Sequence, residues 1–68
     1  MTPQRYRYVF YGKSTQEPTA ALALCHLSDT AAEIDAQTML IASRHVLVEV
    51  WRGTLQVYVG QKKGRGIH

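Results

Sequence analysis

The sequence predicts an α+β fold in the order ββαββ, in which a four-stranded antiparallel sheet carries one helix packed on one face. Two observations lead to this prediction. In residues 46–59, valine or leucine recurs at every second position on both sides of a glycine, as in β-hairpins. Residues 31–43 instead repeat apolar side chains at helical spacing. A chain of 68 residues has room for one core, so we expect a single domain over residues 1–60 and a flexible basic tail over residues 61–68.

The first strand is expected over residues 5–11, which are rich in tyrosine. Tyr6, Tyr8 and Phe10 share one face of this strand. We place them inward, because the opposite choice would bury the guanidinium groups of Arg5 and Arg7.

The segment from residue 19 to residue 27 fits two structures. Alanine and leucine favour a helix, and Pro18 suits a first helical position. Leu22 and Leu24, however, alternate with small residues, and residues 28–30 have the composition of a new helix start. We therefore expect a second strand here, after a polar loop over residues 12–18.

A helix is expected from Ala31 to about Ser43. Thr30 and Glu33 fit a capping box, and Asp29 or Ser28 could cap the helix instead. The side chains of the packing face recur at helical spacing: Ala32, Ala36, Met39, Leu40 and Ser43. Ile34 and Ile41 are expected to widen this apolar stripe.

The alternating pattern of the hairpin predicts its register. A two-residue turn at Arg52 and Gly53 would pair Trp51 with Thr54, and the glycine would supply a positive φ at the second turn position. The alternating apolar residues then share one face: Val46, Val48, Val50, Leu55, Val57 and Val59. The opposite face carries Leu47, Glu49, Trp51, Thr54, Gln56 and Tyr58.

The basic residues are unevenly distributed. The formal net charge is +3, and three of the eight basic residues, Lys62, Lys63 and Arg65, lie in the last seven positions. The other five balance the five acidic residues. A neutral body argues against a dedicated nucleic-acid-binding face.

The composition also bears on location and assembly. The single cysteine, Cys25, cannot form an internal disulfide, and a free thiol in so small a chain indicates a reducing, cytoplasmic setting. No apolar run reaches the roughly 18 residues of a membrane span, and the amino terminus lacks the apolar region of a secretory signal. Because so small a core is marginal, we expect a homodimer.

Three features of the chain recur together in one group of proteins. Residues 6–10 read Tyr-Arg-Tyr-Val-Phe, the helix start carries Asp29 followed by Ala32 and Ala36, and residues 49–53 read Glu-Val-Trp-Arg-Gly. Over residues 5–59 the chain resembles small uncharacterised bacterial proteins with these features, and Cys25 matches a cysteine that precedes their helix cap. The resemblance implies the ββαββ order and implies no particular activity.

One helix can cover only one side of a four-stranded sheet, so the other side should stay open. It combines the aromatic and arginine side chains that are enriched at protein interfaces. We predict a small protein–protein interaction module, an adaptor or an inhibitor acting by occlusion, that self-associates through this face. The predicted interface residues are Arg7, Val9, Tyr11, Leu47, Glu49, Trp51 and Tyr58. In the alternative interpretation Trp51 is an ordinary cross-strand aromatic shielded by arginines, and Glu49 could pair with Arg5 or Arg7 across strands.

A second hypothesis is a nucleic-acid-binding module, in which aromatic side chains stack on bases and cations contact phosphates. Its candidate residues are Arg5, Arg7, Lys62, Lys63 and Arg65. The sequence lacks the glycine-aromatic motif of the common sheet-faced RNA binders, which argues against it.

The sequence predicts no enzyme, and hence no catalytic, cofactor-binding or metal residues and no small-molecule substrate. Cys25 and His26 are adjacent, so on a strand their side chains point to opposite faces and cannot act together. His45 and His68 lack the spacing of metal ligands. We also expect no membrane partner.

Overall fold

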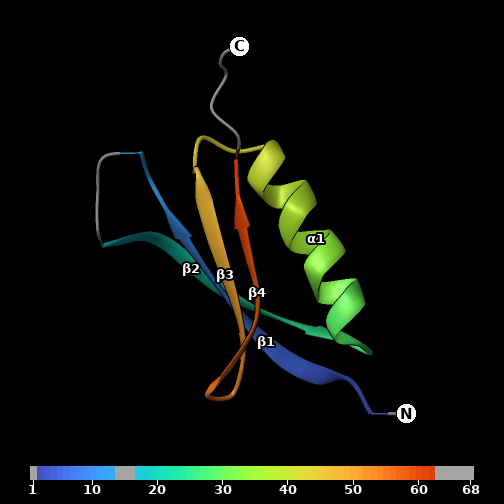
Figure 1. Cartoon of the computed structure of the whole chain (residues 1–68). Coiled ribbons are helices and arrows are strands. Elements are labelled where there is room, and N and C mark those ends of the chain that lie inside the picture. The colour runs from blue at the N-terminus through green and yellow to red at the C-terminus, as the bar shows by residue number, and fades with distance from the viewer. Residues whose placement is uncertain (1, 14–16, 63–68) are drawn as a thin grey trace.

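The structure, a computed structural model, describes residues 2–13 and 17–62 and confirms the α+β class and the ββαββ order. Its elements are β1 (Gln4–Tyr11), β2 (Pro18–His26), α1 (Asp29–Ile41), β3 (Leu47–Arg52) and β4 (Leu55–Gln61). Neighbouring strands are antiparallel, and the order β2-β1-β3-β4 places β1 and β3 in the centre of the sheet. Helix α1 lies along one face of the sheet (Figure 1). Within these residues, no helix combines the length and the apolar character that crossing a membrane requires.

The core lies between α1 and the two central strands. Tyr6, Tyr8 and Phe10 of β1 are at most 3% exposed. Arg5 and Arg7 are exposed on the other face, which confirms the predicted facing of this strand. The buried cluster consists of Tyr6, Tyr8, Phe10, Ala32, Ala36, Leu40, Val48 and Val50. Burying two unpaired guanidinium groups would be strongly unfavourable, so the charges of Arg5 and Arg7 determine which side of β1 faces the helix.

The predicted second strand is confirmed, despite its helix-favouring composition, although it spans residues 18–26 rather than 19–27. Leu22 pairs with Tyr8, and Leu24 pairs with Tyr6. The extended chain therefore places both leucines on the helix side of the sheet, beside the tyrosines. Because α1 packs mainly over β3 and β4, it covers β2 poorly, and Leu24 remains 38% exposed.

The helix begins earlier than the capping-box prediction. Ser28 is the N-cap, with an extended backbone (φ −151°, ψ 160°), and its hydroxyl accepts from the Ala31 N–H at 3.1 Å. The Ser28 alternative is confirmed, and the capping box of Thr30 with Glu33 is wrong. The helix ends at Ile41, two residues before the predicted end.

The two isoleucines expected to widen the apolar stripe face solvent instead. Ile34 is 58% exposed and Ile41 is 76% exposed. The buried side of α1 is a narrow row formed by Ala32, Ala36 and Leu40. The two small side chains let the helix backbone approach the sheet closely, so its flanks stand clear of the strands.

The hairpin register differs from the prediction. The two-residue turn consists of Gly53 and Thr54, so Arg52 pairs with Leu55, and Gly53 takes the first turn position with φ +66°. A positive φ at the first position alone fits a type II′ turn. The sequence analysis placed the turn one residue too early.

A β-bulge then shifts the pairing further along the hairpin. Trp51 pairs with Gln56 but Val50 pairs with Tyr58, which leaves Val57 as the extra residue. The prediction that all the alternating apolar residues share one face is therefore wrong for β4 after the bulge. Val59 lies on the face away from α1 and is 48% exposed.

Tyr58 is the residue that this register brings under the helix. Its ring packs against the core, and its hydroxyl accepts from Gln37 Nε2 at 3.0 Å. The ring also lies over Gly60, where a Cβ would come within 2.7 Å of the Tyr58 hydroxyl oxygen. A glycine two residues after the tyrosine thus makes room for this arrangement.

The last strand extends one residue past the predicted domain end at residue 60. Beyond it, the Lys62 N–H donates to the Val46 carbonyl at 2.8 Å, and Lys62 Nζ donates to the Ser43 carbonyl at 2.6 Å. The remainder of the predicted tail, residues 63–68, lies outside the described residues.

The close approach of α1 to the sheet can be tested by adding volume at Ala36, which is fully buried. We expect Ala36→Leu to lower the free energy of unfolding by about 1–3 kcal/mol, because the helix must move away from the sheet. Urea denaturation followed by circular dichroism measures the change. Thr38→Leu, at an exposed position of the same helix, should change stability by no more than about 0.5 kcal/mol, and equal losses for both variants would contradict the packing argument.

Candidate functional site

The face of the sheet away from α1, here called the open face, is formed by the outward side chains of β1 and β3. Cross-strand pairs join Arg7 to Trp51, Val9 to Glu49 and Tyr11 to Leu47. These six are the predicted interface residues of the two central strands, and the register brings them together as expected. Arg5 lies on the same face at the start of β1, opposite Cys25 of β2.

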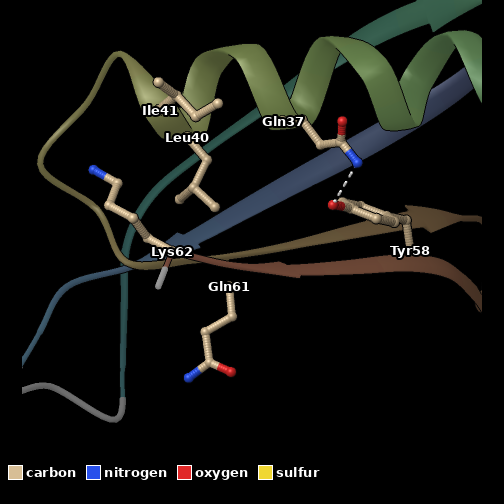
Figure 2. Close-up of a pocket in the computed structure, with 6 residues that line it drawn as sticks. All are labelled: Gln37, Leu40, Ile41, Tyr58, Gln61 and Lys62. Atoms are coloured by element: carbon tan, nitrogen blue, oxygen red, sulfur yellow. Dashed lines mark hydrogen bonds between the residues drawn. The ribbon is translucent and has the colours of Figure 1, made fainter. Parts of the chain in front are cut away.

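The seventh predicted interface residue, Tyr58, lies on the opposite side, and this part of the prediction is wrong. Figure 2 shows its ring pointing from β4 toward α1, with the dashed bond to Gln37. Tyr58 lines a hollow of about 320 Å³ between α1 and β4, whose other lining residues include Leu40 and Ile41. The bulge at Val57 reverses the facing, and no turn-based register could have shown it.

Glu49 organises the centre of the open face. Its Oε1 accepts from the Tyr11 hydroxyl at 3.1 Å and from Trp51 Nε1 at 3.3 Å. Within the described residues the recorded partners of Glu49 are these two aromatic groups, and not the arginines that the sequence suggested. Val9, directly opposite Glu49, is only 9% exposed although no helix covers it. The aromatic pair and the carboxylate thus form a lid of side chains over the middle of the sheet.

Tyr11 is held in its neutral form by this arrangement. Burial of its hydroxyl raises the pKa of Tyr11, and the hydrogen bond to the Glu49 carboxylate and the negative charge of that group raise it further. The Tyr11 hydroxyl is therefore a hydrogen-bond donor to Glu49 at neutral pH.

The arginine end of the open face is more open to a ligand. The guanidinium carbon of Arg7 lies 5.8 Å from the centroid of the Trp51 ring, in a cation–π contact. Beside this pair lies a hollow of about 430 Å³, lined by Arg5, Arg7, Ala23, Trp51 and Gly53. We call it the arginine hollow. It places an aromatic surface and two cations around one open space.

The cations of the nucleic-acid hypothesis are not brought together. Arg5 and Arg7 lie near the start of β1, and Lys62 follows the far end of β4, at the opposite end of the sheet (Figure 1). Six residues of strand separate Arg5 from Tyr11, which amounts to about 20 Å. Lys62 is also bonded to the Ser43 carbonyl, and Lys63 and Arg65 lie outside the described residues.

A polar cluster that the sequence analysis did not identify lies at the other face, below α1. The Tyr8 hydroxyl lies 2.8 Å from His26 Nε2 and 3.2 Å from Asp35 Oδ2, and His26 Nε2 lies 3.3 Å from the same carboxylate oxygen. Burial raises the pKa of Tyr8, and the Asp35 charge adds to the rise. These contacts satisfy the polar end of the buried Tyr8 side chain. These three residues are far apart in the sequence and are not cross-strand partners of one another, so no spacing pattern in the sequence indicated the cluster.

A second tyrosine is tied to the helix in the same way. The Tyr6 hydroxyl donates to Asp29 Oδ1, and this bond is the largest cause of a raised pKa of Tyr6. Arg52 Nε lies 3.3 Å from the same oxygen, close enough for an ion pair, although its N–H makes no hydrogen bond there. Both tyrosines thus hold the amino-terminal half of α1 on the sheet.

In the described part of the chain, Cys25, His26 and His45 lie in different surroundings. Cys25 is exposed, and His26 lies on the other face with Tyr8. His45 stacks against Phe10 at a centroid distance of 5.2 Å, and its Nδ1 lies 2.8 Å from the Thr19 hydroxyl. Among residues 2–13 and 17–62, no three histidine, cysteine, aspartate or glutamate side chains are grouped to hold a metal ion.

Comparisons with protein-family models, with curated proteins and with solved structures gave no significant match.

The role of Glu49 can be tested by removing its carboxylate. We expect Glu49→Ala to lower the free energy of unfolding by about 1–2 kcal/mol, because two half-buried donors lose their acceptor. Glu49→Gln keeps an acceptor oxygen and should lose less than half as much. Chemical denaturation gives both values, and a fluorescence change of Trp51 should accompany the alanine variant. An alanine variant as stable as wild type would show that the side-chain lid contributes nothing.

The raised pKa of Tyr8 predicts a loss of stability in alkali. Its folded-state pKa lies above the ordinary value of 10.0, so the stabilisation is fully present below about pH 10 and is lost as pH rises further. The free energy of unfolding should therefore fall from about pH 9.5 upward, and Tyr8→Phe should make the fall less steep. Urea titrations at stepped pH values measure both slopes. Parallel slopes for the two proteins would contradict the assignment to Tyr8.

Proposed function

We propose that this chain is a small protein-binding module whose open face holds an acidic segment of another protein. The observation that carries the proposal is the arginine hollow, an open space lined by Arg5, Arg7 and Trp51, in which Arg7 lies over the Trp51 ring. Trp, Tyr and Arg are the side chains that most often dominate protein interfaces. As a binding module of this kind, the chain would act as an adaptor, or as an inhibitor that occludes the segment it holds.

The charges of the open face favour an anionic partner. Arg5 and Arg7 are exposed, while Glu49 already accepts hydrogen bonds from Tyr11 and Trp51. The charge left free to meet a partner is therefore positive. Arginine is also suited to carboxylates, because its planar fork can donate two parallel hydrogen bonds to one of them.

Self-association by stacking two open faces is less well supported by the same charges. Two stacked copies would bring surfaces with the same net sign together, since two arginines on each outweigh one glutamate. The Tyr11 hydroxyl and the Trp51 Nε1–H already donate to Glu49 within one copy, so neither donor is free to bond to a second copy. An acidic partner supplies the charge that the face lacks.

A single-stranded nucleic acid is the competing anionic partner. It would need a basic track along the strand that it follows. Of the cations in that hypothesis, Arg5 and Arg7 lie at one end of the sheet, and Lys62 is bonded to the Ser43 carbonyl at the other end. A short acidic peptide needs only the arginine end.

Binding can be followed by the fluorescence of Trp51, the only tryptophan. We expect a short glutamate-rich peptide to bind, and a glutamine-rich peptide of equal length to bind much less. The double variant Arg5→Gln/Arg7→Gln should weaken binding about fivefold to thirtyfold, the equivalent of about 1–2 kcal/mol for two exposed ion pairs. Added salt should weaken wild-type binding in the same direction.

Arg44→Gln serves as the matched control, because it removes one exposed positive charge from the loop after α1. It should leave the affinity for the acidic peptide unchanged. Equal weakening by the control would indicate nonspecific charge attraction. Tighter binding of a single-stranded oligonucleotide than of the acidic peptide would favour the nucleic-acid alternative and overturn the proposal.

A further inference from the structure

The two edges of the sheet are unequal, and β2 is the unprotected one. Proteins usually guard an edge strand with charged side chains, proline or a bulge, because its free main-chain groups invite pairing with another strand. In β2, Pro18 and the irregularity in pairing both lie at the beginning. From Ala20 to His26 the strand is regular and holds no lysine, arginine, aspartate or glutamate.

The other edge, β4, carries the protection that β2 lacks. The bulge at Val57 interrupts its pairing in the middle, and a bulge increases the local twist of an edge. Helix α1 also packs against β4 and lies beside it in the view of the whole chain (Figure 1). A second strand would meet an irregular, partly screened edge there.

Hydrogen bonds at the end of β1 show which main-chain groups point outward. The Val46 N–H donates to the Tyr11 carbonyl at 2.9 Å, so the main-chain groups of Tyr11 point toward β3. Because this direction alternates along a strand, those of Phe10 point toward β2. The Thr19 hydroxyl, which donates to the Phe10 carbonyl at 3.2 Å, agrees with this direction. Ala20, the partner of Phe10, therefore points its own main-chain groups back at β1.

The direction of the main-chain groups alternates along β2 in the same way, so three residues point their N–H and C=O groups away from β1. Leu22 and Leu24 point inward like Ala20, so the N–H and C=O groups of Ala21, Ala23 and Cys25 point out of the sheet. All three of these residues are exposed. Their small side chains place no bulk in the path of another strand.

We propose that β2 is a dimerisation edge, which pairs antiparallel with β2 of a second copy of this chain. An uncharged strand meets its own copy without charge repulsion, and a two-fold axis perpendicular to the sheet makes each contact twice. The product is an eight-stranded sheet of the order β4-β3-β1-β2-β2-β1-β3-β4. Both helices lie on one side of it, and both open faces lie on the other.

The position of α1 leaves room for this partner. Because the helix packs mainly over β3 and β4, the helix side of β2 is left with apolar groups that nothing covers well. Leu24 is 38% exposed, and Leu27, just after the strand, is 57% exposed. In the dimer these leucines flank the new strand pair, where a second copy brings the same groups toward them. Pairing with a second copy would add buried apolar area to a core that is small for an independent domain.

The test compares a proline at each edge, since proline removes an N–H donor and is tolerated where that N–H faces outward. Light scattering coupled to chromatography should give wild type a mass twice the 7.7 kDa of one chain. Ala23→Pro should raise the dimer dissociation constant at least tenfold. Val59→Pro, on β4, is the matched control and should leave the dimer intact. Val59 is suited to this role because its neighbours Tyr58 and Gly60 pair inward with β3.

Hydrogen exchange in the wild type keeps the inference testable if Ala23→Pro fails to fold. On raising the concentration, the amides of Ala21, Ala23 and Cys25 should become protected, while those of Leu22 and Leu24 are protected throughout. A wild type that stays monomeric at millimolar concentration would overturn the inference. So would a dimer that Val59→Pro breaks and Ala23→Pro does not. Neither result depends on whether the open face binds acidic peptides, so the two proposals fail separately.

Discussion

A thirteen-residue helix has to cover the apolar side of a four-stranded sheet, and this constraint determines the rest of the structure. The helix meets the sheet through Ala32 and Ala36, both fully buried. Such small side chains bring two layers close, so the bulk of the core comes from the sheet, in the form of Tyr6, Tyr8 and Phe10. Each buried tyrosine must then find a partner for its hydroxyl. Asp29 and Asp35 on the helix supply those partners, so the same residues that fill the core also fix where the helix lies.

The position of the helix explains the two surfaces that it leaves bare. Being centred over β3 and β4, it exposes the edge of β2 on one side and the whole of the open face behind. The open face compensates through its own side chains, since Glu49 gathers Tyr11 and Trp51 above Val9. Within the described residues, the edge of β2 has no such compensation, and main-chain groups at an edge are satisfied by water or by another strand.

The sequence was sufficient wherever a charge or a strong local preference settled the matter. Arg5 and Arg7 decided the facing of β1, and the alternation of Leu22 and Leu24 decided between strand and helix for β2. The sequence did not predict the register of the last hairpin, because the bulge at Val57 depends on how β4 packs against the helix and the core. Only in the bulged register does Tyr58 pack against the core, accept a hydrogen bond from Gln37 and lie over Gly60. The alternation of apolar residues along the strand carries no information about these tertiary contacts. The same limit applies to the candidate site: six of the seven predicted interface residues share the open face, whereas Tyr58 was assigned to that face through the wrong register.

The two proposed surfaces meet at Ala23, which lines the arginine hollow and also lies on the free edge of β2. In the proposed dimer, the two copies of β1 are separated by three strand spacings, or about 14 Å across the sheet. Both arginine pairs therefore face the same side at a separation that an extended segment of about five residues can span. A partner with acidic groups so spaced would engage both copies at once, and the second contact would form at high effective concentration. Dimerisation through the edge would then strengthen weak binding by exposed arginines without adding any new contact to the hollow itself.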